Sequence, residues 1–388
     1  MIRRSGGAVR PDWERIVESQ GLGFHRAVHP GHLSRPYWDE SVHYEFEMEE
    51  VLRLEAVVEE LHRMCLEAVD HVVAEDRFAE LGIPDWVAPS IRASWQRRDP
   101  HLYGRFDLVY DGSAPPKMLE YNADTPTCLV ESAIIQWHWM RDRFPDGDQW
   151  NSLHERLVDR WAELGPRLPS GTLHFAWTNE DETGEEALTT AYLQETAEQA
   201  GLPTVEIALE DIGWDYAARE FVDLEERAIT AVFKLYPWEW LVKDRFGPLI
   251  LQHLQTLPWI EPVWKMVLSN KAILAILWEM YPDHPNLLPA YLGDPGPLES
   301  YVAKPLLGRE GASMRIVTPH GELVRTPGDY GAEGYVFQDF HPLPEHDGQH
   351  PTLGTWVVGD EAAGLGIRET TGLITDDTSS FVPHVIRV

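Results

Sequence analysis

The first quarter of the chain has the apolar spacing of amphipathic helices. Between residues 51 and 73, apolar side chains recur every three or four positions, close to the 3.6-residue period that places them on one face. A helix of this kind packs its apolar face on a core and needs no other role. The pattern stays helical to about residue 98, so we expect residues 1–100 to form a helical segment packed on the rest of the protein.

Between residues 101 and 260, short apolar runs alternate with helical patterns. Strands are predicted at 106–110, 117–121, 172–177, 204–208 and 228–235, and helices at 126–143 and 185–200. This alternation indicates a mixed α/β region. The loop 179–186 follows a predicted strand directly, which is the usual position of a ligand-binding loop in an open α/β sheet.

From about residue 261 the pattern changes to one helix followed by short strands joined by turns. The helix is predicted at 270–280, and the strands at 301–304, 314–318, 322–325, 335–340, 355–358 and 363–368. Such an order is typical of an α+β module. We therefore expect a third region at 261–388, after a mixed α/β region at 101–260.

The composition describes a globular chain without obvious targeting or cross-linking features. A length of 388 residues with 43% hydrophobic content can bury a large core. Only Cys65 and Cys128 are present, far apart, which argues against a disulfide framework and against a zinc site. There is no membrane-length apolar run, and none follows the basic N-terminus, so we expect a cytoplasmic protein without a membrane partner.

The chain is strongly acidic, with 64 acidic residues against 32 basic ones and a formal charge of -32. This charge would repel a nucleic-acid backbone, so no nucleic-acid partner is expected. It could attract a cationic substrate such as a polyamine, but a surface that keeps the protein soluble explains it more simply. Nothing in the sequence indicates an oligomeric state.

Lysine is scarce among the basic residues. Six lysines are present: Lys117, Lys234, Lys243, Lys265, Lys271 and Lys304. Where arginine dominates, a lysine inside an apolar or glycine-rich segment indicates a need for a compact ammonium group on a flexible stem, as phosphates often require. Lys271 and Lys304 fit this description.

A predicted β-hairpin carries the first group of polar candidates. The strands 106–110 and 117–121 flank an Asp-Gly-Ser turn. Asp107 on one strand can therefore meet Glu120 and Asn122 on the other. Carboxylate and amide oxygens are the ligands that Mg²⁺ prefers. The alternative is that Asp107 and Glu120 are ordinary surface carboxylates that bind no metal.

The strand 301–304 ends in Lys304 and leads into a loop with Gly308 and Gly311. Glycines let backbone N–H groups approach a polyphosphate, while the lysine places one positive charge between phosphate oxygens. Two glycines alone are a weak signal for phosphate. Lys304 and a later strand, described next, strengthen the prediction of a phosphate site.

This later strand, 335–340, becomes polar at Gln338 and Asp339. It could offer an adenine ring a backbone donor and acceptor, with Phe337 or Val336 packed on the ring. By itself it is an ordinary strand.

The strand 363–368 ends in Arg368, which is expected at the rim of a site. The alternative is a surface salt bridge of Arg368 with Glu369 or Asp360. The sequence alone does not decide between the two.

Together these motifs resemble the glutathionylspermidine synthase family of ATP-grasp ligases, in its synthetase domain. The resemblance rests on segments 105–107, 120–127, 270–273, 304–311 and 366–368 in family order, and it covers about residues 10–388. It implies an ATP-grasp-type fold of the α/β and α+β classes. In such a fold a helical and mixed-sheet region, the pre-ATP-grasp region, precedes the nucleotide-binding region, here 261–388.

The resemblance implies ATP and Mg²⁺ as cofactors and assigns roles by position. The implied metal ligands are Asp107, Glu120 and Asn122. The implied catalytic residues, which would hold the transferred phosphoryl group, are Arg105 and Arg368. The implied ATP-binding residues are Lys271, Lys304, Gly308, Gly311, Gln338 and Asp339. The implied substrate-binding residues are Thr125, Thr127 and Glu186.

The implied activity is an ATP- and Mg²⁺-dependent carboxylate–amine ligase that forms an amide through an acyl phosphate. A peptide would supply the carboxylate, and a polyamine or another amine would accept it. Ala187 stands where the family has an amide side chain, so the peptide is left open. The alternative is an ATP-binding protein of the same fold that has lost ligase activity and acts as a regulator or partner. The N-terminal amidase domain of bifunctional members is not expected here.

Overall fold

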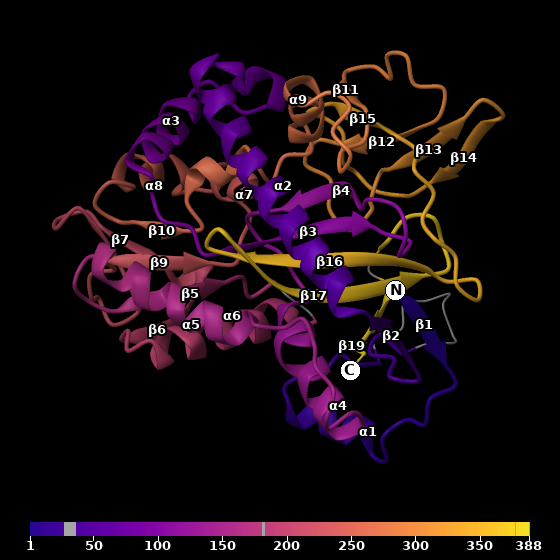
Figure 1. Ribbon diagram of the computed structural model, residues 1–388. Coiled ribbons are helices and arrows are strands. Elements are labelled where there is room, and N and C mark those ends of the chain that lie inside the picture. The colour runs from indigo at the N-terminus through magenta and orange to yellow at the C-terminus, as the bar shows by residue number, and fades with distance from the viewer. Residues whose placement is uncertain (27–35, 181–182, 377, 388) are drawn as a thin grey trace.

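The computed structural model describes residues 1–26, 36–180, 183–376 and 378–387 (Figure 1). At its centre lies a five-stranded sheet built from distant parts of the chain, in the order β18-β17-β16-β3-β4. The strands are β3 (Tyr103–Val109), β4 (Lys117–Asn122), β16 (His350–Val358), β17 (Glu361–Thr370) and β18 (Ser380–Val382). The predicted hairpin is therefore present as β3 and β4, and β16 from the C-terminal part pairs with β3 along its length.

The long helix α2 (Met48–Ala74) crosses one face of this central sheet (Figure 1). Its apolar positions, predicted from their spacing, are buried against the sheet. On this face Phe106 and Tyr121 of neighbouring strands stack with ring centroids 3.9 Å apart. Among the described residues, no helix is both long and apolar enough to cross a bilayer.

A second sheet of five antiparallel strands lies beside the free edge of β4 (Figure 1). In order, its strands are β11 (Ala290–Leu292), β15 (Tyr335–Asp339), β12 (Tyr301–Pro305), β13 (Arg315–Thr318) and β14 (Gly321–Arg325). The helix α9 (Ile273–Met280) packs on this sheet. The α+β pattern expected after residue 261 is confirmed for this part of the chain.

The third sheet is parallel, in the order β10-β9-β5-β6. Its strands are β5 (Leu173–Trp177), β6 (Thr204–Ala208), β9 (Ala231–Lys234) and β10 (Trp259–Ile260), with the helices α5 (Leu153–Leu164) and α6 (Glu185–Gln199) packed beside it. This is the predicted alternation of strands and helices. Within the predicted ligand-binding loop 179–186, positions 181 and 182 lie outside the described residues.

The remaining elements are short and connect or flank these sheets. Before residue 150 they are β1 (Ile2–Ser5), α1 (Trp13–Ser19), β2 (Val42–Phe46), η1 (Arg77–Leu81), α3 (Ala88–Arg97), the π-helical turn η2 (Glu131–Ile135) and α4 (Gln136–Arg143). After it they are η3 (Gly165–Arg167), η4 (Leu209–Asp211), β7 (Gly213–Asp215), β8 (Glu220–Val222), α7 (Trp238–Leu241), α8 (Gly247–His253), η5 (Val263–Met266) and β19 (His384–Ile386).

The expectation of a purely helical N-terminal segment is wrong at its start. β2 lies between β1 and β19, and β19 comes from the far end of the chain (Figure 1). β2 does carry a local signal that the helical interpretation overlooked, because apolar Val42, Tyr44 and Phe46 alternate with His43 and Glu45 and are buried. The central sheet likewise joins residues 103–122 to residues 350–382. The predicted domain boundaries at 100 and 260 therefore do not coincide with the limits of the sheets, and they stay predictions.

A buried ion pair fixes the start of β3. Lys265 Nζ lies 2.6 Å from Glu261 Oε2, with both side chains fully buried, and donates to the carbonyl of Tyr103 at 2.6 Å. Glu261 Oε1 accepts the backbone N–H groups of Leu102 and Tyr103. The segment that follows β10 therefore anchors the strand that carries Arg105 and Asp107.

We expect Lys265→Met to destabilise the fold by about 3–5 kcal/mol, because it leaves Glu261 as a buried charge without a cation. Urea unfolding followed by circular dichroism measures this loss. Lys243→Met is the matched control, since Lys243 is 61% exposed where it pairs with Glu333 and should cost less than about 1 kcal/mol. Equal losses in the two variants would contradict the role given to Lys265.

Candidate active site

The strand register gathers the polar candidates on one face of the central sheet. Asp107 pairs with Glu120, and Arg105 pairs with Asn122, across β3 and β4. Side chains two residues apart on a strand point to the same side, so these four share a face, opposite to Phe106 and α2. The predicted meeting of the two carboxylates and the amide is therefore present.

Asp107 is buried between two guanidinium groups. Arg105 donates to Asp107 Oδ1 from Nε at 2.7 Å, and Arg368 on β17 donates to Oδ2 from Nη2 at 2.9 Å. Arg368 thus faces into the site and bonds Asp107 rather than Glu369 or Asp360. Burial by itself would lower the pKa of Arg105, but the charge of Asp107 raises it, so the guanidinium stays charged.

Gly354 on β16 makes room for Arg105. It pairs with Asp107 in the sheet, and a Cβ atom at this position would lie 2.9 Å from Arg105 Cδ. The arginine side chain therefore lies across the glycine, where any larger residue would push it away from Asp107.

Glu120 is held by a lysine and an amide. Lys271 Nζ lies 2.9 Å from Glu120 Oε2, and Asn122 donates to Oε1 at 3.2 Å. Burial would raise the pKa of Glu120, but the charges of Lys271 and Lys304 outweigh it and lower the pKa, so the carboxylate is ionised. Like Asp107, Glu120 is no surface group.

Local capping positions Lys271 just before α9. The side chain of Asn270 accepts the Ala272 N–H at 2.9 Å and donates to the carbonyl of Leu81 at 2.7 Å. The backbone N–H of Lys271 donates to the carbonyl of Leu306. This rigid turn aims the lysine at Glu120.

Lys304 lies buried at the junction of two sheets. Its Nζ donates to the carbonyl of Leu119 on β4 at 2.8 Å and to Gln338 Oε1 on β15 at 2.7 Å. Gln338 in turn donates to the carbonyl of Met118 at 3.0 Å. Burial lowers the pKa of Lys304 to about 8, although the charge of Glu120 opposes this effect.

Two adjoining cavities open on this face. The first, of about 660 Å³, has apolar walls that include Leu119, Val302, Met314 and Ile316. The predicted residues that line it are Asp107, Glu120, Lys304, Gly311, Gln338, Asp339 and Arg368. The second, of about 740 Å³, is polar, and the predicted residues that line it are Arg105, Glu120, Asn122, Thr125, Thr127, Lys271, Gly308, Gly311 and Arg368. Every predicted site residue except Glu186 therefore lines one cavity or both.

The apolar wall differs from the expected one. Phe337 and Val336 do not line the first cavity, whereas Val302 and Ile316 do. Strand alternation turns Phe337 to the other face of the sheet, where it packs on Tyr301, and Val336 is fully buried. The N–H groups of residues 339 and 340 also already bond carbonyls of neighbouring segments.

The glycine-bearing loop after β12 lies where the two cavities meet. Arg309 donates to Thr125 Oγ1 at 2.9 Å, which ties the loop to the segment after β4. Gly311 has φ +69°, and a Cβ atom there would lie 2.7 Å from Ile374 Cγ2. Only glycine fits this close approach in a left-handed conformation.

Two glutamates near the second cavity, one buried and one half-buried, escaped the sequence reasoning. Glu185 accepts the Cys128 N–H at 3.4 Å, while neither it nor its neighbour Glu186 lines the two cavities. Burial, and then the nearby charge of Glu131, raise the pKa of Glu185 to about 8. Glu131 accepts the hydroxyl of Tyr37. Neighbouring helix residues point about 100° apart, so only the orientation of α6 decides which glutamate faces inward.

Asp124 was not singled out in the sequence, but it holds the threonine-bearing segment in place. Its carboxylate accepts Lys234 Nζ at 2.6 Å and the backbone N–H of Trp238 at 2.8 Å, with all three buried. This pairing anchors the chain between Asn122 and Thr125.

Comparison with known proteins identifies the family. The family model described as glutathionylspermidine synthase preATP-grasp matches residues 4–387. The chain belongs to the glutathionylspermidine synthase family. The fold also resembles a solved glutathione synthetase-like effector from Globodera pallida, with a TM-score of 0.59 over 97% of each chain and 10% identity. That likeness supports the fold and not the activity.

Relatives with curated names are ligases and synthetases, so this is a family of ATP-dependent ligases. A Haemophilus influenzae protein, provisionally named an acid–amine ligase, is 39% identical over 99% of both chains. Trypanothione synthetase of Crithidia fasciculata is 30% identical over 89% of this chain, and the bifunctional glutathionylspermidine synthetase/amidase of Escherichia coli is 31% identical over 84%. The chain spans 57% and 56% of the lengths of these two relatives.

We expect Lys304 to lose its proton near pH 8 in the ligand-free protein, being charged below that pH and neutral above it. Burial favours the neutral amine, whose ordinary pKa is 10.5. With ¹³Cε-labelled lysine the chain gives only six signals, and Lys304→Met identifies the one in question. A midpoint above pH 10 for that signal would contradict the burial described for this side chain.

Proposed function

We propose that the chain is an ATP- and Mg²⁺-dependent carboxylate–amine ligase that forms an amide through an acyl phosphate. One observation carries this proposal: four cationic side chains converge on Asp107 and Glu120 between two adjoining cavities. Without ligand, the two carboxylates offset two of the four positive charges. A triphosphate with its divalent ion brings both negative and positive charge. The cationic side chains can then bind phosphate oxygens while the carboxylates bind the ion.

The donor set fits Mg²⁺. Asp107, Glu120 and Asn122 would hold it, since their oxygens are the hard ligands that this ion prefers. When bound, Mg²⁺ neutralises phosphate charge and makes the terminal phosphoryl group easier to attack.

For the nucleotide, we assign the first cavity to adenine and ribose. Val302, Met314 and Ile316 offer an apolar wall, and Gln338 and Asp339 are the polar groups beside it. Lys304, Lys271 and the glycines of the loop, Gly308 and Gly311, would then hold the phosphates at the junction of the cavities.

In the proposed reaction, a substrate carboxylate oxygen attacks the γ-phosphorus of ATP, and the bond to the bridging oxygen of ADP breaks. The amine nitrogen then attacks the acyl carbon, expels phosphate and loses a proton, which leaves the amide. Arg105 and Arg368 would stabilise the negative charge that develops on the phosphoryl oxygens. The loop 307–314, tied to Thr125 through Arg309, would exclude water from the acyl phosphate.

We assign the second cavity to the acid and amine substrates. Thr125 and Thr127 offer hydroxyls to a peptide carboxylate beside Arg105, which already donates to the carbonyl of Thr127. The buried Glu131 and the half-buried Glu185 lie close together and would ionise in the presence of a cationic amine. The names of the relatives support a glutathione-type peptide and a polyamine, and Glu186 stays a candidate at the edge of this region.

A screen for ADP release tests the function. Peptides and amines are supplied in pairs with Mg²⁺ and ATP, and we expect ADP to appear only when both substrates are present, together with an amide product detected by mass spectrometry. ATP binding by calorimetry without ADP release for any pair would show a nucleotide-binding protein and overturn the ligase.

We expect Arg368→Lys to lower kcat by about 100-fold, because a preorganised donor to the developing charge is lost. Steady-state ADP release measures the effect. Arg325→Lys is the matched control, since Arg325 is 59% exposed and pairs with neighbouring Glu322 in β14. An active Arg368→Lys variant would exclude Arg368 from the reaction.

We expect Glu120→Gln to raise the Mg²⁺ concentration for half-maximal activity by at least about tenfold, since an ionised ligand becomes a neutral one. Titrating Mg²⁺ at saturating ATP measures the shift. Glu322→Gln is the control, since Glu322 is an exposed glutamate on β14 of the second sheet, and it should leave the Mg²⁺ dependence unchanged. An unaltered dependence in Glu120→Gln would remove Glu120 from the ion.

A further inference from the structure

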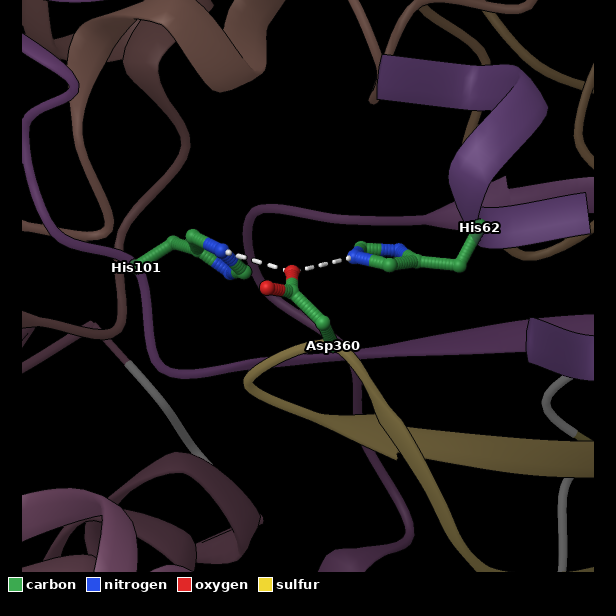
Figure 2. A group of neighbouring side chains, drawn as sticks. All are labelled: His62, His101 and Asp360. Atoms are coloured by element: carbon green, nitrogen blue, oxygen red, sulfur yellow. Dashed lines mark hydrogen bonds and ion pairs between the residues drawn. The ribbon is translucent and has the colours of Figure 1, made fainter. Parts of the chain in front are cut away.

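A second group of possible metal ligands lies behind the central sheet, on the side of α2. His62 comes from α2, His101 from the segment before β3, and Asp360 from the turn between β16 and β17. In Figure 2 both imidazole rings point a nitrogen at the carboxylate of Asp360. Three segments distant in sequence thus converge on one point.

Two of the three separations between donor atoms are close to those of a tetrahedral metal site. His62 Nε2 and His101 Nε2 lie 3.1 Å and 3.4 Å from Asp360 Oδ1, and one ligand atom from each residue lies within 4.8 Å of the others. Around a tetrahedral ion with bonds of about 2.0–2.1 Å, ligand atoms are about 3.3 Å apart. Both histidine–carboxylate separations are already close to this value.

Surrounding groups hold the two imidazoles in the orientation that a metal needs. His62 Nδ1 lies 3.1 Å from the hydroxyl of Tyr121, so an Nδ1–H that donates there leaves the Nε2 lone pair free. The carbonyl of His101 accepts two bonds from Arg160, and its ring packs edge-on against Trp264. Burial lowers the pKa of both imidazoles, that of His101 to about 3, so both rings are neutral at pH 7.

We propose that His62, His101 and Asp360 bind one divalent transition-metal ion such as Zn²⁺. Two imidazoles and one carboxylate suit such an ion, whereas Mg²⁺ prefers the all-oxygen set on the other face of the sheet. The Asp360 side chain is 68% exposed, which gives the ion a path from solvent and leaves room for a water ligand.

The bound ion would act as a clamp on the back of the sheet that carries the candidate active site. It would join α2, the segment before β3 and the β16–β17 turn through metal–ligand bonds. The two cysteines, Cys65 and Cys128, are free and form no disulfide that could do this. Tyr121, which contacts His62, lies on β4 between Glu120 and Asn122 and points to the opposite face. The ion would thus fix the strand that positions those two side chains.

A hydrogen-bonded network without metal is the competing arrangement. In it Tyr121 donates to His62 Nδ1, and both Nε2–H groups donate to Asp360. The two arrangements need opposite tautomers of His62, and only one of them binds an ion.

Metal titration of the full chain decides between them. After chelation and dialysis, the protein is titrated with Zn²⁺ by calorimetry and with Co²⁺ by visible absorption, with excess Mg²⁺ and ATP present to occupy the other site. We expect one equivalent to bind, tetrahedral Co²⁺ bands to appear, and Zn²⁺ to raise Tm.

Asp360→Asn should weaken Zn²⁺ binding by at least about tenfold and abolish the rise in Tm, and His101→Gln should do the same. Glu60→Gln is the matched control, because Glu60 is a half-exposed carboxylate beside a single histidine, His284, at 3.6 Å, and it should bind Zn²⁺ like the unaltered protein. Circular dichroism verifies that each variant is folded.

Absence of binding to the folded, unaltered chain would leave only the hydrogen-bonded network and overturn the proposal. Binding of equal strength in Asp360→Asn and the unaltered chain would overturn it as well, because the ion would then lie elsewhere.

Discussion

The contact on which the site depends is the sharing of Asp107 by two guanidinium groups, one from β3 and one from β17. A carboxylate buried this deeply is stable as an anion only with cations and donors around it. The same pairing therefore joins β3 to β17 and holds the side chains of Arg105 and Arg368 in place. A ligand that brings its own anion and cation can replace these partners without exposing an uncompensated charge.

The rest of the fold holds the other cations against this pair. Lys304 and Gln338 bond carbonyls of β4, so the second sheet meets the hairpin through main-chain acceptors that do not depend on the side chains at positions 118 and 119. Asn270 fixes Lys271, and Arg309 ties the glycine-bearing loop to Thr125. The cavities are thus bounded by segments already held in register, and little ordering remains to be done when a nucleotide binds.

The sequence predicted what depends on local pattern. The hairpin pattern predicted that Asp107 and Glu120 meet on neighbouring strands, although not the bulge after Asp107 that sets their register, and the burial of α2 follows from its 3.6-residue spacing. Long-range pairings carry no such signal: the pairing of β16 with β3 and of β2 with β19 joins segments hundreds of residues apart. For the same reason His62, His101 and Asp360 could not be grouped in advance, and the choice between Glu185 and Glu186 had to await the orientation of α6.

The arrangement of the central sheet also bears on how the protein is made. During synthesis β3 and β4 leave the ribosome before their neighbours, because β16, which pairs with β3, begins 228 residues after β4 ends (350 against 122), and β17, which carries Arg368, follows β16. Until then Asp107 lacks one of its two arginines, and the hairpin has an unpaired edge. The candidate active site can therefore assemble only after β16 and β17 have been made, and a chain that stops before β16 would lack both the partner strand of β3 and Arg368.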